Sequence, residues 1–192
     1  MLCCLSGLKL NYTKVIPNLS STYDRADSQS DFRSNLWIPR PLPGHTPAYV
    51  HPVKLQRGNC PMFWWSFNGR CYKYVASRLT WADAELHCVS QGANLVAIHS
   101  VEEHNFVNSL INNFDPARGY TWIGISDTAK EGGWTWSDGS AVDFVLWDAG
   151  QPDNAGGHEN CGHTNYGPKL KWNDYPCSKL FTFVCETRLV CP

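Results

Sequence analysis

The chain has 192 residues, a length that suits one ordinary domain and is short for two. Its formal net charge is -1, so the overall charge does not favour nucleic acid or an anionic membrane surface as a partner. No run of about twenty apolar residues predicts a transmembrane helix, and membrane insertion is not expected.

Residues 1–59 are predicted to form a disordered or atypical N-terminal tail. They contain many prolines and a polar run, SSTYDRADSQSD, and they show no sustained apolar period of 2 or 3.6. The opening sequence MLCCLSGLKLNYTK has an apolar run of only about seven residues and no positive charge before it, so it is not a convincing signal peptide.

The nine cysteines indicate disulfides more than a metal site. No CxxC occurs and no Cys/His group has zinc-finger spacing, so a structural zinc site is not predicted. Dispersed cysteines in a small aromatic-rich domain are typical of an oxidising compartment, and we therefore expect a secreted, extracellular protein. The cysteines are Cys3, Cys4, Cys60, Cys71, Cys88, Cys161, Cys177, Cys185 and Cys191.

Ordered structure is expected to begin at Cys60. Large apolar residues alternate on both sides of an Asn68-Gly69 pair, which predicts a β-hairpin that a disulfide from Cys60 to Cys71 would close. Further along the chain, Cys161 and Cys177 flank the segment that follows a long loop, and their pairing would tie that loop down.

Two helices are predicted from their capping residues. Thr80 and Asp83 open the first, which is expected to stop at Gly92. Ser100 and Glu103 form a capping box for the second. The buried stripe of the second helix is expected to comprise Phe106, Val107, Leu110 and Ile111.

Short strands alternate with glycine-rich loops in the rest of the chain. Strands are predicted at residues 95–98, 120–125, 134–136, 171–174 and 181–186. The loop from Ser137 to Pro168 is longer than about fifteen residues, a length that in a compact domain is usually functional or disordered. A disulfide from Cys161 favours an ordered, functional loop.

The motif QPDNAGGHENC at residues 151–161 and the motif KWND at 171–174 supply hard oxygen donors. The candidate metal ligands are Gln151, Asp153, Glu159, Asn173 and Asp174. Such a set fits calcium, which takes six to eight oxygens, and it does not fit zinc or iron. Three carboxylates without a cation would repel one another, so we expect Ca²⁺ to be part of the folded loop. Pro152 predicts a cis peptide bond that sets the neighbouring side chains on the same side.

The motifs WADAELHC, WIGI, QPD, HENC, KWND and FVCE occur in an order and spacing that resemble the C-type lectin domain. The resemblance covers residues 60–187 and leaves 188–192 as a C-terminal tail. It implies an α+β fold with two helices, two small antiparallel sheets and a long calcium-binding loop. It also implies three disulfides, which join Cys60 to Cys71, Cys88 to Cys185 and Cys161 to Cys177.

In this family the principal site binds both calcium and sugar, and it maps onto Gln151, Asp153, Glu159, Asn173 and Asp174. The residues implied as carbohydrate contacts are Gln151, Asp153, Glu159 and Asn173. The order of amide then carboxylate in QPD goes with galactose or N-acetylgalactosamine in the family, because it exchanges which sugar hydroxyl meets a donor and which an acceptor. We therefore expect galactose-type glycans on glycoproteins or cell surfaces as partners, with a role in recognition or agglutination.

This chain departs from the family pattern in two places. The aromatic ring that many galactose-binding members carry shortly after QPD is replaced by Asn154 and Ala155, so Trp136, Trp147 and Tyr166 are the alternative rings for stacking on the sugar. The family's auxiliary calcium site would fall on Asp127, Glu131, Asn154, Glu159 and Asn160. Two of these are amides where carboxylates are usual, which predicts weaker calcium binding.

Other functions remain open beside the lectin hypothesis. An enzyme is not predicted, since the seven histidines are scattered and are most simply surface or capping residues, as for His99, His104 and His163. The chain also resembles fish type II antifreeze proteins, although Asn160 stands where those have an extra cysteine. A protein-binding lectin-like module is the third hypothesis. Cys3, Cys4 and Cys191 lie outside the expected pairs and would be available to crosslink a homo-oligomer.

Overall fold

The computed structural model describes residues 54–189, and the predicted N-terminal tail up to residue 53 lies outside them. The two helices are α1, Trp81–Val89, and α2, Val101–Phe114. Both begin where their caps predict: Thr80 accepts from the backbone N–H of Asp83, and Ser100 accepts from that of Glu103. Capping chemistry is local, and the sequence was therefore sufficient to place both helix starts.

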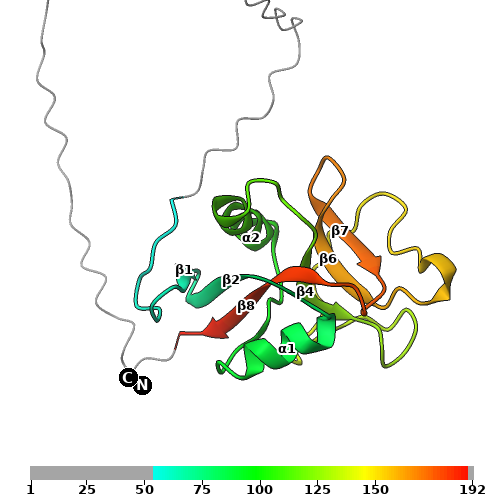
Figure 1. Ribbon diagram of the computed structural model, residues 1–192, viewed down its shortest axis with the longest axis horizontal. Coiled ribbons are helices and arrows are strands. Elements are labelled where there is room, and N and C mark those ends of the chain that lie inside the picture. Colours follow the sequence, from blue (N-terminus) through cyan, green and yellow to red (C-terminus); the bar gives the residue numbers. More distant parts are fainter. Residues whose placement is uncertain (1–53, 190–192) are drawn as a thin grey trace, which may run out of the picture. The chain divides into compact units, whose positions relative to one another are not determined.

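The strands join in one sheet whose order is β1-β2-β8-β4-β6-β7, with β3 paired to β8 and β5 to β4 (Figure 1). Their bounds are β1 Trp65–Phe67, β2 Arg70–Leu79, β3 Asn94–Leu95, β4 Thr121–Ser126, β5 Thr135–Trp136, β6 Cys161–Tyr166, β7 Lys171–Tyr175 and β8 Phe181–Arg188.

The predicted α+β lectin fold is confirmed, and the sheet differs in one respect from the expected two separate antiparallel sheets. A short parallel pairing of β4 with β8, at Thr121 with Thr182 and Trp122 with Phe183, connects two halves of the sheet. One half contains β1, β2, β3 and β8, and the other contains β4, β5, β6 and β7. All other strand pairs are antiparallel. The halves meet because β4 lies between β8 and β6 in the sheet.

Each face of the sheet has its own apolar core and its own helix, as the alternation of side chains along a strand requires. In β8, Phe183 and Cys185 belong to the core that includes Ala84 and Cys88 of α1. Between them, Val184 belongs to the core that α2 covers. Figure 1 shows α1 and α2 on opposite sides of the sheet.

The three implied disulfides are present, with S–S distances of 2.05 Å for Cys60–Cys71, 1.96 Å for Cys88–Cys185 and 2.02 Å for Cys161–Cys177. The bridge from Cys88 to Cys185 ties α1 to β8 across 97 positions of sequence. On the chain-entropy account, a loop of this length contributes about 4 to 5 kcal/mol to stability. The disulfides therefore fix the helix, the hairpin and the long loop to the sheet.

Of three local predictions, one is confirmed and two need adjustment. The predicted hairpin turn is confirmed, with Asn68 at φ 45° and Gly69 at φ 77°. Ordered contacts begin before Cys60, however, because the backbone oxygen of Gln56 accepts from Ser66 and Leu55 packs against the α2 core. The predicted strand at 95–98 is strand only at Leu95, although Val96–Ile98 are fully buried.

Candidate metal centre

The long loop ends earlier than the sequence indicates, because Cys161–Tyr166 form strand β6. β6 pairs with β7, which sets Gly162 opposite Asp174 and His163 opposite Asn173. The upstream part of the loop is held on the other edge of β7: Asp148 donates its N–H to the backbone oxygen of Trp172 at 2.9 Å. Residues 151–161 and 173–174 are thereby brought together.

Gly162 permits this close packing. A Cβ at that position would lie 2.2 Å from Cγ2 of Ile125 and 3.5 Å from the Trp147 ring, so a larger residue would push β6 away from β4. The QPD turn begins four positions after Trp147, and its Gln151-Pro152 peptide bond is cis, as predicted. The chain thus enters the turn from the closely packed region around Trp147.

Three of the predicted ligands form an acidic cluster. Asp153, Glu159 and Asp174 each offer one carboxylate oxygen, and these oxygens all lie within 4.8 Å of one another. Calcium–oxygen bonds are about 2.3 to 2.6 Å, so two oxygens on a single ion are at most about 5 Å apart. The spacing of the cluster therefore fits one shared cation.

The other two predicted ligands carry oxygen atoms without partners. Gln151 Oε1 and Asn173 Oδ1 are buried and accept no hydrogen bond from any residue in the range 54–189. A buried acceptor left unpaired costs about 1 to 3 kcal/mol, which an ion ligated by these oxygens would offset. The donor set of three carboxylates and two neutral carbonyls fits calcium.

The acidic oxygens are held in place by the loop's own backbone. Asp174 is fully buried and accepts from the N–H groups of Asp153, at 3.2 Å, and Asn154, at 2.8 Å. Glu159 accepts from Ala155 N–H at 3.0 Å, and its own N–H donates to the side chain of Asn154 at 3.0 Å. Asn154 adopts the left-handed conformation that this turn needs.

Electrostatics also favour a cation at this cluster. Burial raises the pKa of the Glu159 carboxyl, and the charges of Asp174 and Asp153 act in the same direction, against the lowering effect of the Ala155 N–H. The ionised cluster is therefore unfavourable on its own. A divalent ion bound at the cluster would instead favour the ionised carboxylates.

The residues predicted for an auxiliary cation are arranged differently. The Asn160 side chain donates from Nδ2 to Asp127 at 2.9 Å and to Glu131 at 3.5 Å. The other Asp127 oxygen accepts from Gly132 N–H at 2.7 Å. The Glu159 N–H donates a hydrogen bond to the Asn154 side chain within the main loop. An amide donor thus stands between the two acids, where the family pattern has a cation.

Two residue roles differ from those expected. His163 and His104 are not surface residues, since their exposed fractions are 0% and 3%. His163 lies on β6 in contact with Asn173, whose Nδ2 also donates to the backbone oxygen of Asp174 at 2.5 Å. Both N–H groups of Asn173 therefore have acceptors within the protein, and the sugar contact of this residue stays a prediction. Because β6 is not predicted from the sequence, no local pattern indicated the buried position of His163.

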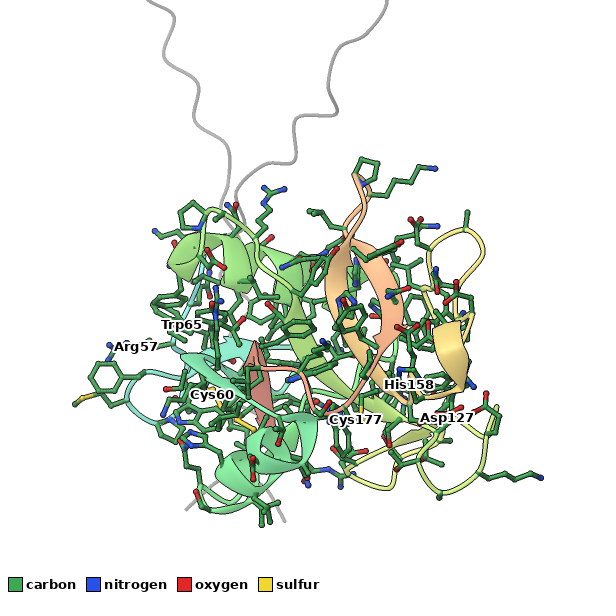
Figure 2. All side chains as sticks on the ribbon, turned by 45° about the vertical axis from the view of Figure 1, so that its right-hand side comes forward. Arg57, Cys60, Trp65, Asp127, His158 and Cys177 are labelled. Carbon is green, nitrogen blue, oxygen red and sulfur yellow. A yellow bond between two sulfur atoms is a disulfide. The ribbon has the colours of Figure 1, made fainter. Side chains whose placement is uncertain are left out.

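Of the rings considered for stacking on a sugar, Trp136 is core, at 2% exposed. Trp147 and Tyr166 are partly buried, and Trp147 packs against Trp134 and Trp172. His158 is an exposed side chain on the rim of the loop, and its Nδ1 lies 2.8 Å from the Gly156 carbonyl oxygen. Figure 2 shows His158 on the same side of the domain as Asp127 and Cys177, away from Arg57 and Trp65.

Comparisons with known proteins agree with this fold. Residues 77–187 match the family model described as the lectin C-type domain. The lactose-binding lectin l-2 of Anguilla japonica is 42% identical over 140 residues, covering 71% of this chain and 82% of the relative. The galactose-specific lectin nattectin of Thalassophryne nattereri is 37% identical over 131 residues, covering 68% and 82%.

Among solved structures, herring type II antifreeze protein is similar with a TM-score of 0.64 and 39% identity, covering 68% of this chain and 100% of that one. Among residues 54–189, no helix has the length and apolarity needed to cross a membrane. The matched domain covers more than half of the chain and contains both helices and the whole acidic cluster. The chain belongs to the C-type lectin family.

Proposed function

We propose that this chain is a calcium-dependent lectin that binds terminal galactose or N-acetylgalactosamine. The observation that carries the proposal is the cluster of three carboxylates from two segments, together with buried oxygens on the nearby residues Gln151 and Asn173 that have no partner among residues 54–189. The printed names of two relatives, lactose-binding and galactose-specific, support the same sugar class. A carbohydrate-binding role, and not catalysis, is what members of this family have in common.

In the proposed site, some atoms of the ligand residues bind the ion and others form hydrogen bonds with the sugar. A calcium ion held by Gln151, Asp153, Glu159, Asn173 and Asp174 would supply coordination positions for two neighbouring sugar hydroxyls. Gln151 keeps an amide N–H for donation, and Asp153 and Glu159 keep carboxylate oxygens for acceptance. Because the amide precedes the carboxylate in QPD, donor and acceptor are placed in the order that we associate with galactose.

The direct test is retention of the purified protein on galactose-agarose in calcium, followed by elution with EDTA. Retention that needs calcium and is competed by free galactose supports the proposal. A protein that binds calcium and passes through the galactose column, yet is retained on mannose, would contradict the sugar assignment. One ion and a few hydrogen bonds give weak binding, so the resin should be densely substituted.

Ice binding is the second candidate, since herring type II antifreeze protein is similar over its whole length. Faceted ice crystals and thermal hysteresis in calcium would support it. Binding to a protein partner that is unaffected by EDTA and by galactose would favour the third hypothesis. We also propose secretion, because the three disulfides require an oxidising compartment to persist.

A further inference from the structure

His163 occupies an unusual position for a histidine. It lies on β6 directly opposite Asn173 on β7, and none of its surface is exposed. Its ring lies 4.4 Å from that of Tyr120, measured between ring centroids. The further rings around it are Trp122, Tyr166, Tyr175 and Phe181. The imidazole is therefore locked in orientation next to a predicted ion ligand.

The hydrogen bonds of His163 define its tautomer. Nδ1 lies 3.0 Å from the backbone oxygen of Thr164, and a carbonyl oxygen can only accept. Nδ1 must therefore carry the proton. The remaining nitrogen, Nε2, lies 3.3 Å from the amide nitrogen of Asn173, which can only donate, so Nε2 is an acceptor.

That acceptor faces the amide of Asn173. Asn173 Nδ2 lies 3.3 Å from His163 Nε2 and 2.5 Å from the backbone oxygen of Asp174. The two N–H groups of the amide thus have one acceptor each. The amide is planar, so fixing its nitrogen fixes its oxygen, and Oδ1 is the buried atom without a partner.

We propose that His163 is a positioning residue for the calcium centre, and that it acts by holding the Asn173 amide with its oxygen available to the ion. This inference rests on the proposed function, since it assigns a role within the same site. His163 itself does not touch the ion or the sugar. Without the Nε2 of His163, the amide would be held only by the Asp174 oxygen and could turn to present an N–H group to the cation. Partners that orient a metal ligand typically contribute about 10- to 100-fold in affinity.

The test is a double-mutant cycle measured by calcium titration calorimetry. His163→Leu is expected to weaken calcium binding by about 10-fold or more, because the amide loses one of its two acceptors. In an Asn173→Asp background the ligand oxygen remains but there is no N–H group for Nε2 to accept. There, His163→Leu is expected to leave calcium affinity unchanged. An equal loss of affinity in both backgrounds would overturn the proposal, because it would mean a general effect on the fold.

A matched control separates positioning from stability. His104 is the second buried histidine, at 3% exposed, and its Nδ1 accepts from the Trp172 indole at 3.1 Å without touching a predicted ligand. His104→Leu is expected to lower the melting temperature and to leave the calcium dissociation constant unchanged. His163→Gln retains an acceptor oxygen and is expected to recover most of the lost affinity, whereas His163→Met, which has no such oxygen, is not.

A measurement on the unchanged protein keeps the proposal falsifiable if the variants do not fold. Two-bond ¹H–¹⁵N correlation spectra at neutral pH are expected to show His163 as the Nδ1–H tautomer. The Nε2–H tautomer would overturn the proposal, because Nε2 would then be unable to accept from Asn173. Failure of the wild-type protein to bind calcium would instead contradict the proposed function itself.

Discussion

Replacing Glu159 with glutamine is expected to have opposite effects on the stability of the calcium-free domain and on the stabilisation gained from calcium. Glu159 is 8% exposed, and its ligand oxygen lies within 4.8 Å of those of Asp153 and Asp174. In EDTA the substitution removes one of three mutually repelling charges, so the calcium-free domain is expected to become more stable. In calcium the same substitution removes a charged ligand, so the stabilisation gained from the ion is expected to shrink.

The magnitudes follow from the spacing of the oxygens. Two unit charges 4.8 Å apart repel by about 0.9 kcal/mol in bulk water and about 3.5 kcal/mol at an effective dielectric of about 20. Asp153 is exposed, so the lower figure suits its pair with Glu159, and a net relief of about 1 kcal/mol or more is expected. Loss of a charged ligand is expected to lower the calcium affinity at least about 10-fold, which corresponds to about 1.4 kcal/mol of binding free energy.

Differential scanning calorimetry in EDTA and in a fixed calcium excess measures both effects. For a domain of this size about 1 kcal/mol corresponds to roughly 3 to 5 °C in Tm. Glu159→Gln should therefore raise the Tm in EDTA by about 3 °C or more and reduce the calcium-induced rise in Tm by about 4 to 7 °C. Glu102→Gln, which changes an exposed acid on α2, should leave the calcium-induced rise intact. A lower Tm in EDTA with a full calcium response would refute the reasoning, since Glu159 would then serve only as an acceptor for Ala155.

Three further predictions concern sugar choice, calcium stoichiometry and pH. Gln151→Glu combined with Asp153→Asn reverses the amide and carboxylate and should shift the preference from galactose toward mannose, measured by competition of column binding. Asn160→Asp replaces the amide that donates to Asp127 with a carboxylate, and calorimetry should then count two calcium ions per chain where the wild type binds one. Burial lowers the pKa of His104 to about 4, with a smaller contribution from the charge of Lys171. The unfolded chain binds that proton more readily, so lowering the pH from 7.5 to 5.5 should remove about 1.4 kcal/mol of stability through this residue, measured by urea unfolding in EDTA against His104→Gln.

Each of these predictions has a clear contrary outcome. An unchanged galactose preference in the exchanged QPD variant would assign sugar choice to other parts of the loop. Two calcium ions in the wild-type protein would mean that Asn160 does not exclude the auxiliary ion. Equal pH dependence in His104→Gln and the wild type would show that His104 is not a source of acid sensitivity.

Local chemistry made much of the fold predictable. The caps at Thr80 and Ser100 and the Asn68-Gly69 turn each act within four residues, and the structure has them where the sequence indicates. Strand β6 was not predicted, because its sequence, CGHTNY, contains glycine, asparagine and histidine, which are poor strand signals. It is a strand because β4 and β7 pair with it on both sides.

The sequence by itself determined the type of site: oxygen donors only, from two motifs, in an order of amide and carboxylate that sets the sugar hypothesis. Residue types and short spacings carry that information. Only the tertiary structure decided which donors converge, that Asn160 bridges Asp127 and Glu131, and that His163 lies buried behind Asn173. These relations join residues up to 33 positions apart, and they depend on strand register and burial, which no local pattern specifies.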